Sequence, residues 1–260
     1  HALACYTITI SARGCKASVD LLRQLNDDHE MGQALLSLAL LSNRLGCFQE
    51  AHRHYRNSFR IFEKINDKSG MSTCLYLQGN LALKRGEYAL AQSVLQTSLD
   101  GYLEMTDEIG AARAQFCLGL VDIAEGRFEQ AEEKFYSSLD THSRNDNASG
   151  IAQSHFGLGY AAHAQRNHDV AFEHHLISYR LYKEIHELPG QALILANFAM
   201  VSYSQKDTLR AKEFCDESFA IATHIGYKAL LPIILNVLGK LAAEVGDFRL
   251  ARQHFHQGYA

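Results

Sequence analysis

Histidine and cysteine are the residues of this sequence that could ligate a metal ion or attack a substrate. Fourteen histidines occur, and some stand close together in the chain: His52 with His54, His174 with His175, and His254 with His256. Residues one or two positions apart on a helix point in different directions. No two histidines have the i, i+4 spacing of a helical zinc site. We therefore expect solvated or capping histidines and no metal site.

The six cysteines give no sign of disulfide or thiol chemistry. None forms a Cys-x-x-Cys pair, and they are scattered along the chain: Cys5, Cys15, Cys47, Cys74, Cys117 and Cys215. A scattered set is typical of a reduced intracellular protein, in which cysteine acts as a small buried hydrophobic residue. The sequence therefore predicts a cytoplasmic location.

Other motifs of catalysis or cofactor binding are also missing. The sequence has no glycine-rich phosphate loop and no nucleophile elbow. The run Asn145-Asp146-Asn147 lacks the acidic ladder and the distal glutamate of a calcium loop, so we interpret it as a turn. We predict a protein that is not an enzyme and has no catalytic residue and no cofactor. The alternative is an enzyme with histidine ligands, which a stoichiometric metal in the purified protein would establish.

Composition argues against nucleic-acid and membrane partners. The formal net charge is −4, and lysine and arginine form no stripe. Direct nucleic-acid binding normally requires such a basic footprint. No apolar run approaches the roughly 20 residues of a membrane span. We expect neither kind of partner for this segment.

Small residues recur at a fixed spacing along the chain. Every fortieth position holds an alanine: Ala51, Ala91, Ala131, Ala171, Ala211 and Ala251. A second column with this spacing contains Ala39, Gly79, Gly119, Gly159, Ala199 and Gly239. A third contains Ser58, Ser98, Ser138, Ser178 and Ser218 and ends in Gly258. Self-similarity at a fixed period of 20–50 residues indicates a stacked repeat.

Each repeat unit is predicted to be a pair of amphipathic helices. Apolar residues recur at helical spacing from Gly110 to Gly126 and again from Phe128 to Asp140. A glycine between the two helices can adopt the left-handed conformation that ends a helix. Two units read Arg166-Asn167-His168 and Lys206-Asp207-Thr208 instead, and there we expect Asn or Asp to make the turn one residue later. The small columns predict close helix crossings.

The combined motif resembles the tetratricopeptide repeat (TPR). Leu118-Gly119, Gly126-Arg127-Phe128, Ala131 and Phe135 match that repeat in order and spacing. The period of 40 exceeds the family's usual value of about 34. This long form is similar to the repeats of MalT-type regulators, signal-transducing NTPases and Pins-type scaffolds. The position of the usual large aromatic residue holds instead Leu35, Leu75, Gln115, His155, Leu195 and Leu235.

The resemblance implies an all-α fold, a right-handed superhelical array of TPR-like helix hairpins (an α-solenoid) with about thirteen helices. We expect a single array over 1–260, with residues 11–26 as the second helix of its first unit. The expected units are about 1–29 (partial), 30–69, 70–109, 110–149, 150–189, 190–229 and 230–260 (truncated). Both ends suggest a fragment of a longer protein.

In TPR arrays the first helix of each pair lines a concave groove, and here the groove positions are largely apolar and aromatic. The predicted partner-binding residues are Tyr76, Asn80, Arg113, Phe116, Leu120, Gln153, Phe156, Tyr160, Met200 and Tyr203. A contiguous exposed apolar groove usually marks an interaction site. The alternative is that these residues pack between adjacent first helices. The basic ladder by which some TPR proteins hold a C-terminal carboxylate is absent.

These features predict a protein- or peptide-binding TPR module with its partner in the groove. The resemblance suggests the sensor or interaction segment of a larger intracellular regulator, either a signal-transducing NTPase or a transcription activator. The alternative is a structural scaffold that acts mainly through self-association. Light scattering over a range of concentrations distinguishes the two, because a scaffold of that kind would form dimers.

Overall fold

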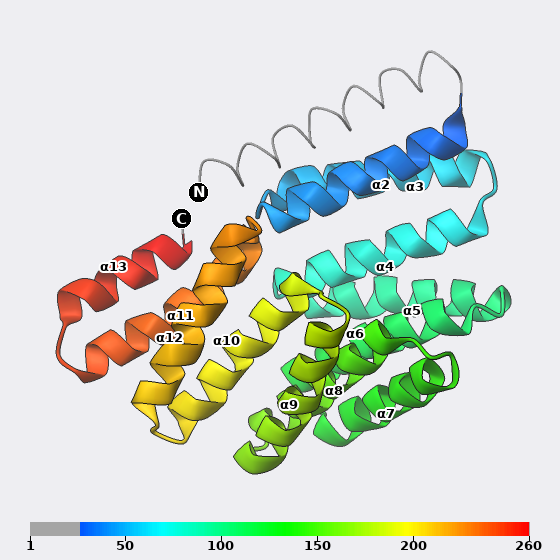
Figure 1. The fold of residues 1–260 in the computed structure, drawn as a ribbon. Coiled ribbons are helices and arrows are strands. Elements are labelled where there is room, and N and C mark those ends of the chain that lie inside the picture. Colours follow the sequence, from blue (N-terminus) through cyan, green and yellow to red (C-terminus); the bar gives the residue numbers. More distant parts are fainter. Residues whose placement is uncertain (1–26, 260) are drawn as a thin grey trace. The chain divides into compact units, whose positions relative to one another are not determined.

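The computed structural model describes residues 27–259, and within this range the chain is all α-helical. The range contains twelve α-helices, one short 3-10 helix and no strand. It forms two compact units, residues 27–145 and residues 146–259 (Figure 1). In each unit successive helix pairs pack against one another, which confirms the predicted array of TPR-like hairpins. The helix predicted for residues 11–26 lies outside the described residues, and the single array over 1–260 stays a prediction.

Unit 27–145 contains three helix hairpins. Its helices are α2 (Asp28–Arg44), α3 (Phe48–Lys64), α4 (Lys68–Lys84), α5 (Tyr88–Glu104), α6 (Glu108–Ala124) and α7 (Phe128–Arg144). The two helices of each hairpin pack together, and the second helix of one hairpin also packs on the first helix of the next. The first helices α2, α4 and α6 contact one another in series, so they form one face of the unit.

Unit 146–259 repeats this arrangement. Its helices are α8 (Ala148–Ala164), α9 (His168–Glu184), α10 (Leu188–Ser204), α11 (Thr208–His224), α12 (Leu231–Glu244) and α13 (Phe248–Tyr259), with the 3-10 helix η1 (Lys228–Leu230) before α12. The first helices α8, α10 and α12 again contact one another in series. Pro189 and Pro232 lie in the first turns of α10 and α12, where a missing backbone N–H costs little.

The turn inside each hairpin uses a left-handed residue. Gly46, Gly86, Gly126 and Gly246 have φ between +74° and +81°. In the two hairpins without this glycine, Arg166 and Lys206 adopt φ of 63° and 64° themselves. The expected one-residue shift is therefore wrong, because Asn167 and Asp207 are the N-cap residues of the second helices. All hairpins keep the same register.

The alanine and glycine columns lie where the two helices of a hairpin cross. Ala131 is fully buried. A Cβ atom added to Gly119 would lie 2.7 Å from the ring of Phe135. Such a distance leaves no room for a side chain, and the prediction of close helix crossings is confirmed.

The serine column has a role beyond its small size. Four of its buried hydroxyls donate a hydrogen bond to a first-helix carbonyl 26 residues earlier: Ser58 to Gly32 (2.8 Å), Ser98 to Ser72 (2.8 Å), Ser178 to Ala152 (2.7 Å) and Ser218 to Ala192 (2.7 Å). A buried hydroxyl without a partner would be costly. These hydrogen bonds fix the position of the second helix along the axis of the first helix.

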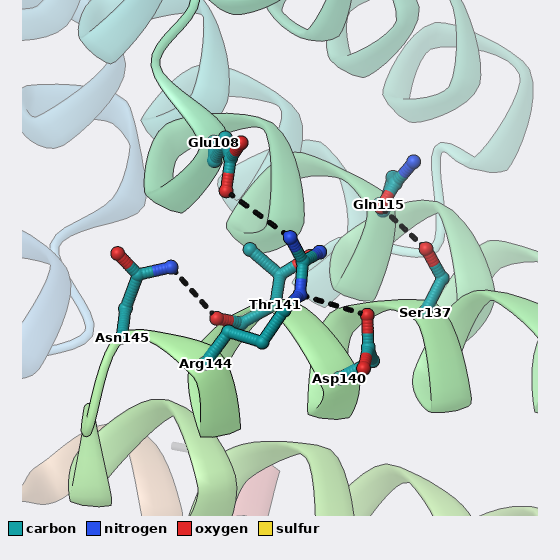
Figure 2. A network of polar contacts seen from close by, with 7 residues as sticks. All are labelled: Glu108, Gln115, Ser137, Asp140, Thr141, Arg144 and Asn145. Atoms are coloured by element: carbon teal, nitrogen blue, oxygen red, sulfur yellow. Dashed lines mark hydrogen bonds and ion pairs between the residues drawn. The ribbon is translucent and has the colours of Figure 1, made fainter.

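Polar side chains connect α6 and α7 at their surface (Figure 2). Arg144 lies 3.7 Å from the Glu108 carboxylate of α6 and 3.0 Å from Asp140 of its own helix. Asn145 donates from Nδ2 to the Thr141 carbonyl at 2.9 Å. The Arg144, Glu108 and Asp140 side chains are mostly exposed, so these ion pairs stabilise the hairpin only weakly.

A second set of charges in this hairpin is centred on one buried carboxylate. Asp122 of α6, whose side chain is 6 % exposed, accepts from Arg127 and from Lys134, each at 2.6 Å. Arg127 lies in the turn and Lys134 lies on α7. One buried carboxylate therefore holds the end of α6, the turn and the second helix together.

Candidate functional site

The ten predicted partner-binding residues all lie on first helices, five in each unit. Unit 27–145 carries Tyr76, Asn80, Arg113, Phe116 and Leu120 on α4 and α6. Unit 146–259 carries Gln153, Phe156, Tyr160, Met200 and Tyr203 on α8 and α10. The two sets are described separately.

In unit 27–145, polar contacts cross from α6 to α4. The Arg113 guanidinium lies 4.6 Å from the centre of the Tyr76 ring. Asn80 Nδ2 donates a hydrogen bond to Cys117 Sγ at 3.5 Å. Burial raises the pKa of the Tyr76 phenol and raises the pKa of the Cys117 thiol to about 11. Both groups therefore stay neutral and unreactive, and they serve packing rather than chemistry.

Two of the predicted contact residues are inside this unit. Tyr76 is 5 % exposed and Phe116 is 2 % exposed. The Phe116 ring lies 5.3 Å from that of Phe135, on the second helix of the same hairpin. A side chain this deeply buried offers a partner almost no area. Of this set only Arg113, which is exposed, and the half-buried Asn80 and Leu120 reach the surface.

In unit 146–259 the predicted residues are all half-buried. Phe156 and Tyr160 stack on each other along α8 with ring centres 6.0 Å apart. Met200 and Tyr203 lie on α10, which packs against α8. Aromatic and thioether groups with one face buried and one face exposed are suited to recognising a partner.

A cavity adjoins this set at Met200. It measures about 320 Å³ and is lined by Met200, Pro232, Ile233, Asn236, Val237, Lys240, Phe255 and Gly258. Ligand pockets usually range from about 300 to 1,000 Å³, so this one is suited to a side chain or two rather than to a large metabolite. Lys240 lies one repeat period after Met200. The sequence period could therefore have added Lys240 to the predicted site.

The charge on this surface is small and mixed. The exposed Lys240 ammonium lies 5.8 Å from the centre of the Tyr203 ring. A hydrogen bond with the Glu244 carboxylate raises the pKa of the Tyr203 phenol, which stays neutral. The surface can therefore hold apolar side chains and offer one ammonium donor to a neighbouring carbonyl or carboxylate. We call Gln153, Phe156, Tyr160, Met200, Tyr203 and Lys240 the α8–α12 surface.

Known proteins share sequence and structural features with this chain. A family model described as tetratricopeptide repeat matches residues 30–104. One similar solved structure is a signal transduction ATPase with numerous domains that carries a tetratricopeptide repeat sensor, from Pyrococcus horikoshii, at 15 % identity and a TM-score of 0.59; the match covers 98 % of this chain and 40 % of that one. No curated protein matches the chain.

Residues 30–104 are therefore tetratricopeptide repeats, and the chain has the fold of TPR proteins. Two further solved structures share its fold. The match to a Rap protein complexed with competence and sporulation factor has a TM-score of 0.77 at 12 % identity and covers 98 % of this chain and 70 % of that one. The match to NprR in complex with its cognate peptide NprX has a TM-score of 0.74 at 15 % identity and covers 95 % and 75 %.

Two histidines differ from the expectation of solvated or capping residues. His142 and His175 are fully buried, at 1 % and 0 % exposed. They stand one repeat period after the buried Tyr102 and Phe135, so the repeat period could have indicated their burial although their residue type did not. Within residues 27–259, no three histidine, cysteine, aspartate or glutamate side chains form a group that could hold a metal ion.

The cysteines mostly follow the prediction. Cys74, Cys117 and Cys215 are buried, and burial raises the pKa of Cys74 to about 11 and that of Cys215 to about 12. Cys47 departs from it, because it is exposed before the first turn of α3. As for membranes, no helix in the described part of the chain has both the length and the apolar character that a span requires.

Proposed function

We propose that this chain is a protein- or peptide-binding TPR module whose partner binds the α8–α12 surface. The observation that carries the proposal is the row of half-buried aromatic and apolar side chains on α8 and α10 that leads to the cavity beside Met200. In protein interfaces a few large side chains that fill pockets supply most of the binding energy. Phe156, Tyr160 and Met200 are residues of this kind.

The expected partner is a peptide or a protein segment with two or more apolar side chains. One of them would fill the cavity, and the stacked rings of Phe156 and Tyr160 would cover another. Lys240 would donate to a carbonyl or carboxylate between them. A Rap protein complexed with competence and sporulation factor and NprR in complex with its cognate peptide NprX have similar folds, which supports a peptide as the partner.

Selection from a random peptide library on the purified chain tests the proposal, and hydrogen exchange of the complex then maps the binding site. We expect selected peptides to be rich in apolar residues and to slow exchange in α10 and α12 more than in α11. Failure to select any peptide, or slowed exchange confined to α9 and α11, would contradict it. Light scattering of the free chain excludes self-association as the source of the signal.

The proposal extends to the parent protein. We infer that the module is the sensor or interaction segment of a larger intracellular regulator, a signal-transducing NTPase or a transcription activator. The similarity to the TPR sensor of the archaeal signal transduction ATPase supports this. The sequence of the complete gene tests it. A P-loop domain in the same reading frame is the expected result, and a complete reading frame without an NTPase or a DNA-binding domain would contradict it.

A further inference from the structure

The α8–α9 hairpin contains five histidines that lie between its two helices or in its turn region: His155, His163, His168, His174 and His175. Neither α8 nor α10, the two first helices that flank α9, contains any Asp, Glu, Lys or Arg. Apart from tyrosines, the ionisable side chains between the helices of this hairpin are therefore histidines.

Four of these histidines stand where other repeats have apolar residues. One repeat period before or after, their counterparts are Leu195 for His155, Ile123 for His163, Phe128 for His168 and Phe135 for His175. The equivalence is also spatial for His175. A Cβ atom on Gly159 would lie 2.6 Å from its ring, just as one on Gly119 would lie 2.7 Å from Phe135. This hairpin therefore has titratable rings at core positions.

The contact between His155 and His174 limits the charge that the pair can carry. Their Nδ1 atoms lie 3.0 Å apart across α8 and α9. In a hydrogen bond of this kind one nitrogen donates its hydrogen and the other must be unprotonated. Two imidazolium rings cannot share the contact, so protonation of both rings would break it and add two like charges between α8 and α9.

His175 opposes protonation more strongly. It is fully buried between Phe156 and Phe198, whose ring centres lie 6.1 and 6.0 Å away. Neither of its ring nitrogens has a hydrogen-bond partner in the described structure. An imidazolium at this site would bury a charge and two unpaired N–H groups, which is costly. His163 and His168, with ring centres 5.3 Å apart, also each bury an Nδ1 atom without a partner.

The charged groups of the packed helices are exposed or contact other side chains. On α9 the carboxylates Asp169 and Glu173 are exposed, and Asp169 accepts from Gln205 at 3.4 Å. On α11 the nearest charges contact other rings: Arg210 covers Phe172 at 4.7 Å and Glu217 accepts from Tyr179 at 3.4 Å. The other ionisable groups on α8, α9 and α10 are tyrosines and the outward charges Arg180, Lys183 and Glu184.

We propose that the α8–α9 hairpin is a proton-sensitive element, closed while its histidines are neutral and opened when they take up protons. Opening would separate Phe156 on α8 from the α9 side chains that support it. The inference stands on the hairpin alone and does not require the α8–α12 surface to bind a partner.

The direction of the pH dependence follows from the pKa shifts. Burial, together with the nearby His174, lowers the pKa of His155 to about 4, and burial lowers that of His175 to about 3. The ordinary value is about 6.5. The stabilisation by these neutral rings is therefore complete above about pH 6.5 and is lost as the pH falls toward 4 and 3. Within this window, each ring increases the equilibrium constant for opening of the hairpin about tenfold for every pH unit by which the pH falls.

Hydrogen exchange of the full chain at pH 7.5 and pH 5.0, with EDTA present, tests the proposal. Protection factors in α8 and α9 should fall by up to ~1,000-fold, about 30-fold for each of His155 and His175. Those in α4 and α5, which contain no histidine, provide the reference. The double variant His155→Leu with His175→Phe carries the residue types of the equivalent positions Leu195 and Phe135. In this variant the protection factors of α8 and α9 should fall little more than those of α4 and α5.

The control is His224→Gln, which replaces an exposed histidine and should leave the pH response of α8 and α9 unchanged. His175→Phe alone provides a second variant with about half of the effect on a logarithmic scale. An NMR titration of the His175 ring should show no protonation between pH 7.5 and 5.0 in the closed state. Equal pH responses in the wild type and both core variants, or a His175 ring that titrates near pH 6.5, would overturn the proposal.

Discussion

Single residues set the distance between the helices of each hairpin. Ala131 lies at a crossing where Gly119 already touches the Phe135 ring. Ala131→Leu should therefore overpack the crossing and lower the free energy of unfolding by roughly 1–3 kcal/mol. Urea unfolding measures the loss. Ala89→Leu, an equal change at an exposed position of α5, is the control, and equal stabilities of the two variants would show that the alanine column has another cause.

Asp122 is a second residue on which one hairpin depends. Replacing it by Asn keeps the shape but removes the negative charge that Arg127 and Lys134 share. Because hydrogen bonds between charged groups are strong when buried, Asp122→Asn should cost about 1–3 kcal/mol in the free energy of unfolding. Asp216→Asn, which breaks the exposed pair with Lys212, should have little effect. A neutral result for Asp122→Asn in chemical denaturation would contradict this role.

The limits of sequence reasoning are clearest at this scale. Spacing predicted that Ala131 and Gly119 are buried, because only small residues fit a close crossing. It could not predict that Tyr76 and Phe116 are buried while Phe156 and Tyr160 are half-exposed. All four occupy equivalent faces of first helices, and their exposure depends on which neighbouring side chains cover them. The residue type of His175 suggests the surface, and only its position one repeat period after Phe135 indicates that it is buried.

At the scale of helices and turns, the left-handed residue decides where each helix ends. Thr106 ends α5 with φ of 56°, although its β-branched side chain disfavours that conformation. Asn tolerates it better. Thr106→Asn should therefore raise the free energy of unfolding by about 0.5–1 kcal/mol, seen as a higher melting temperature. Asn66→Thr, the reverse change at the equivalent turn, should lower the free energy of unfolding. A less stable Thr106→Asn variant together with a more stable Asn66→Thr variant would contradict the explanation.

The turns were predictable only in part. Glycine at four hairpin turns indicated the left-handed conformation correctly. Arg166 and Lys206 adopt it as well, because the hydrogen bonds from Asn167 to Ala162 and from Asp207 to Ser202 hold the chain in the same path. The packing of the two helices determines which residue occupies the left-handed position, and this effect is stronger than the local preference of that position for Asn or Asp.

At the scale of the whole molecule, the repeat period was enough to predict the class of fold. Three columns of small residues determine that each unit is a helix hairpin and that hairpins pack in series. The binding surface was harder to predict. The repeat period indicates on which face of a helix a residue lies, but it does not indicate how deeply its side chain is buried. The cavity beside Met200 also depends on Phe255 and Gly258 of α13, which lie on a second helix.

The dissociation constant of a peptide selected on the wild-type chain tests the central claim most directly. It should be measured by fluorescence anisotropy for the wild type, for Tyr160→Ala with Met200→Ala, and for Glu213→Ala on the exposed side of α11. The double variant should bind about 30-fold more weakly, a loss of about 2 kcal/mol, and Glu213→Ala should bind as the wild type does. Unchanged affinity in the double variant with full helicity, or loss of binding in Glu213→Ala alone, would contradict the α8–α12 surface as the binding site.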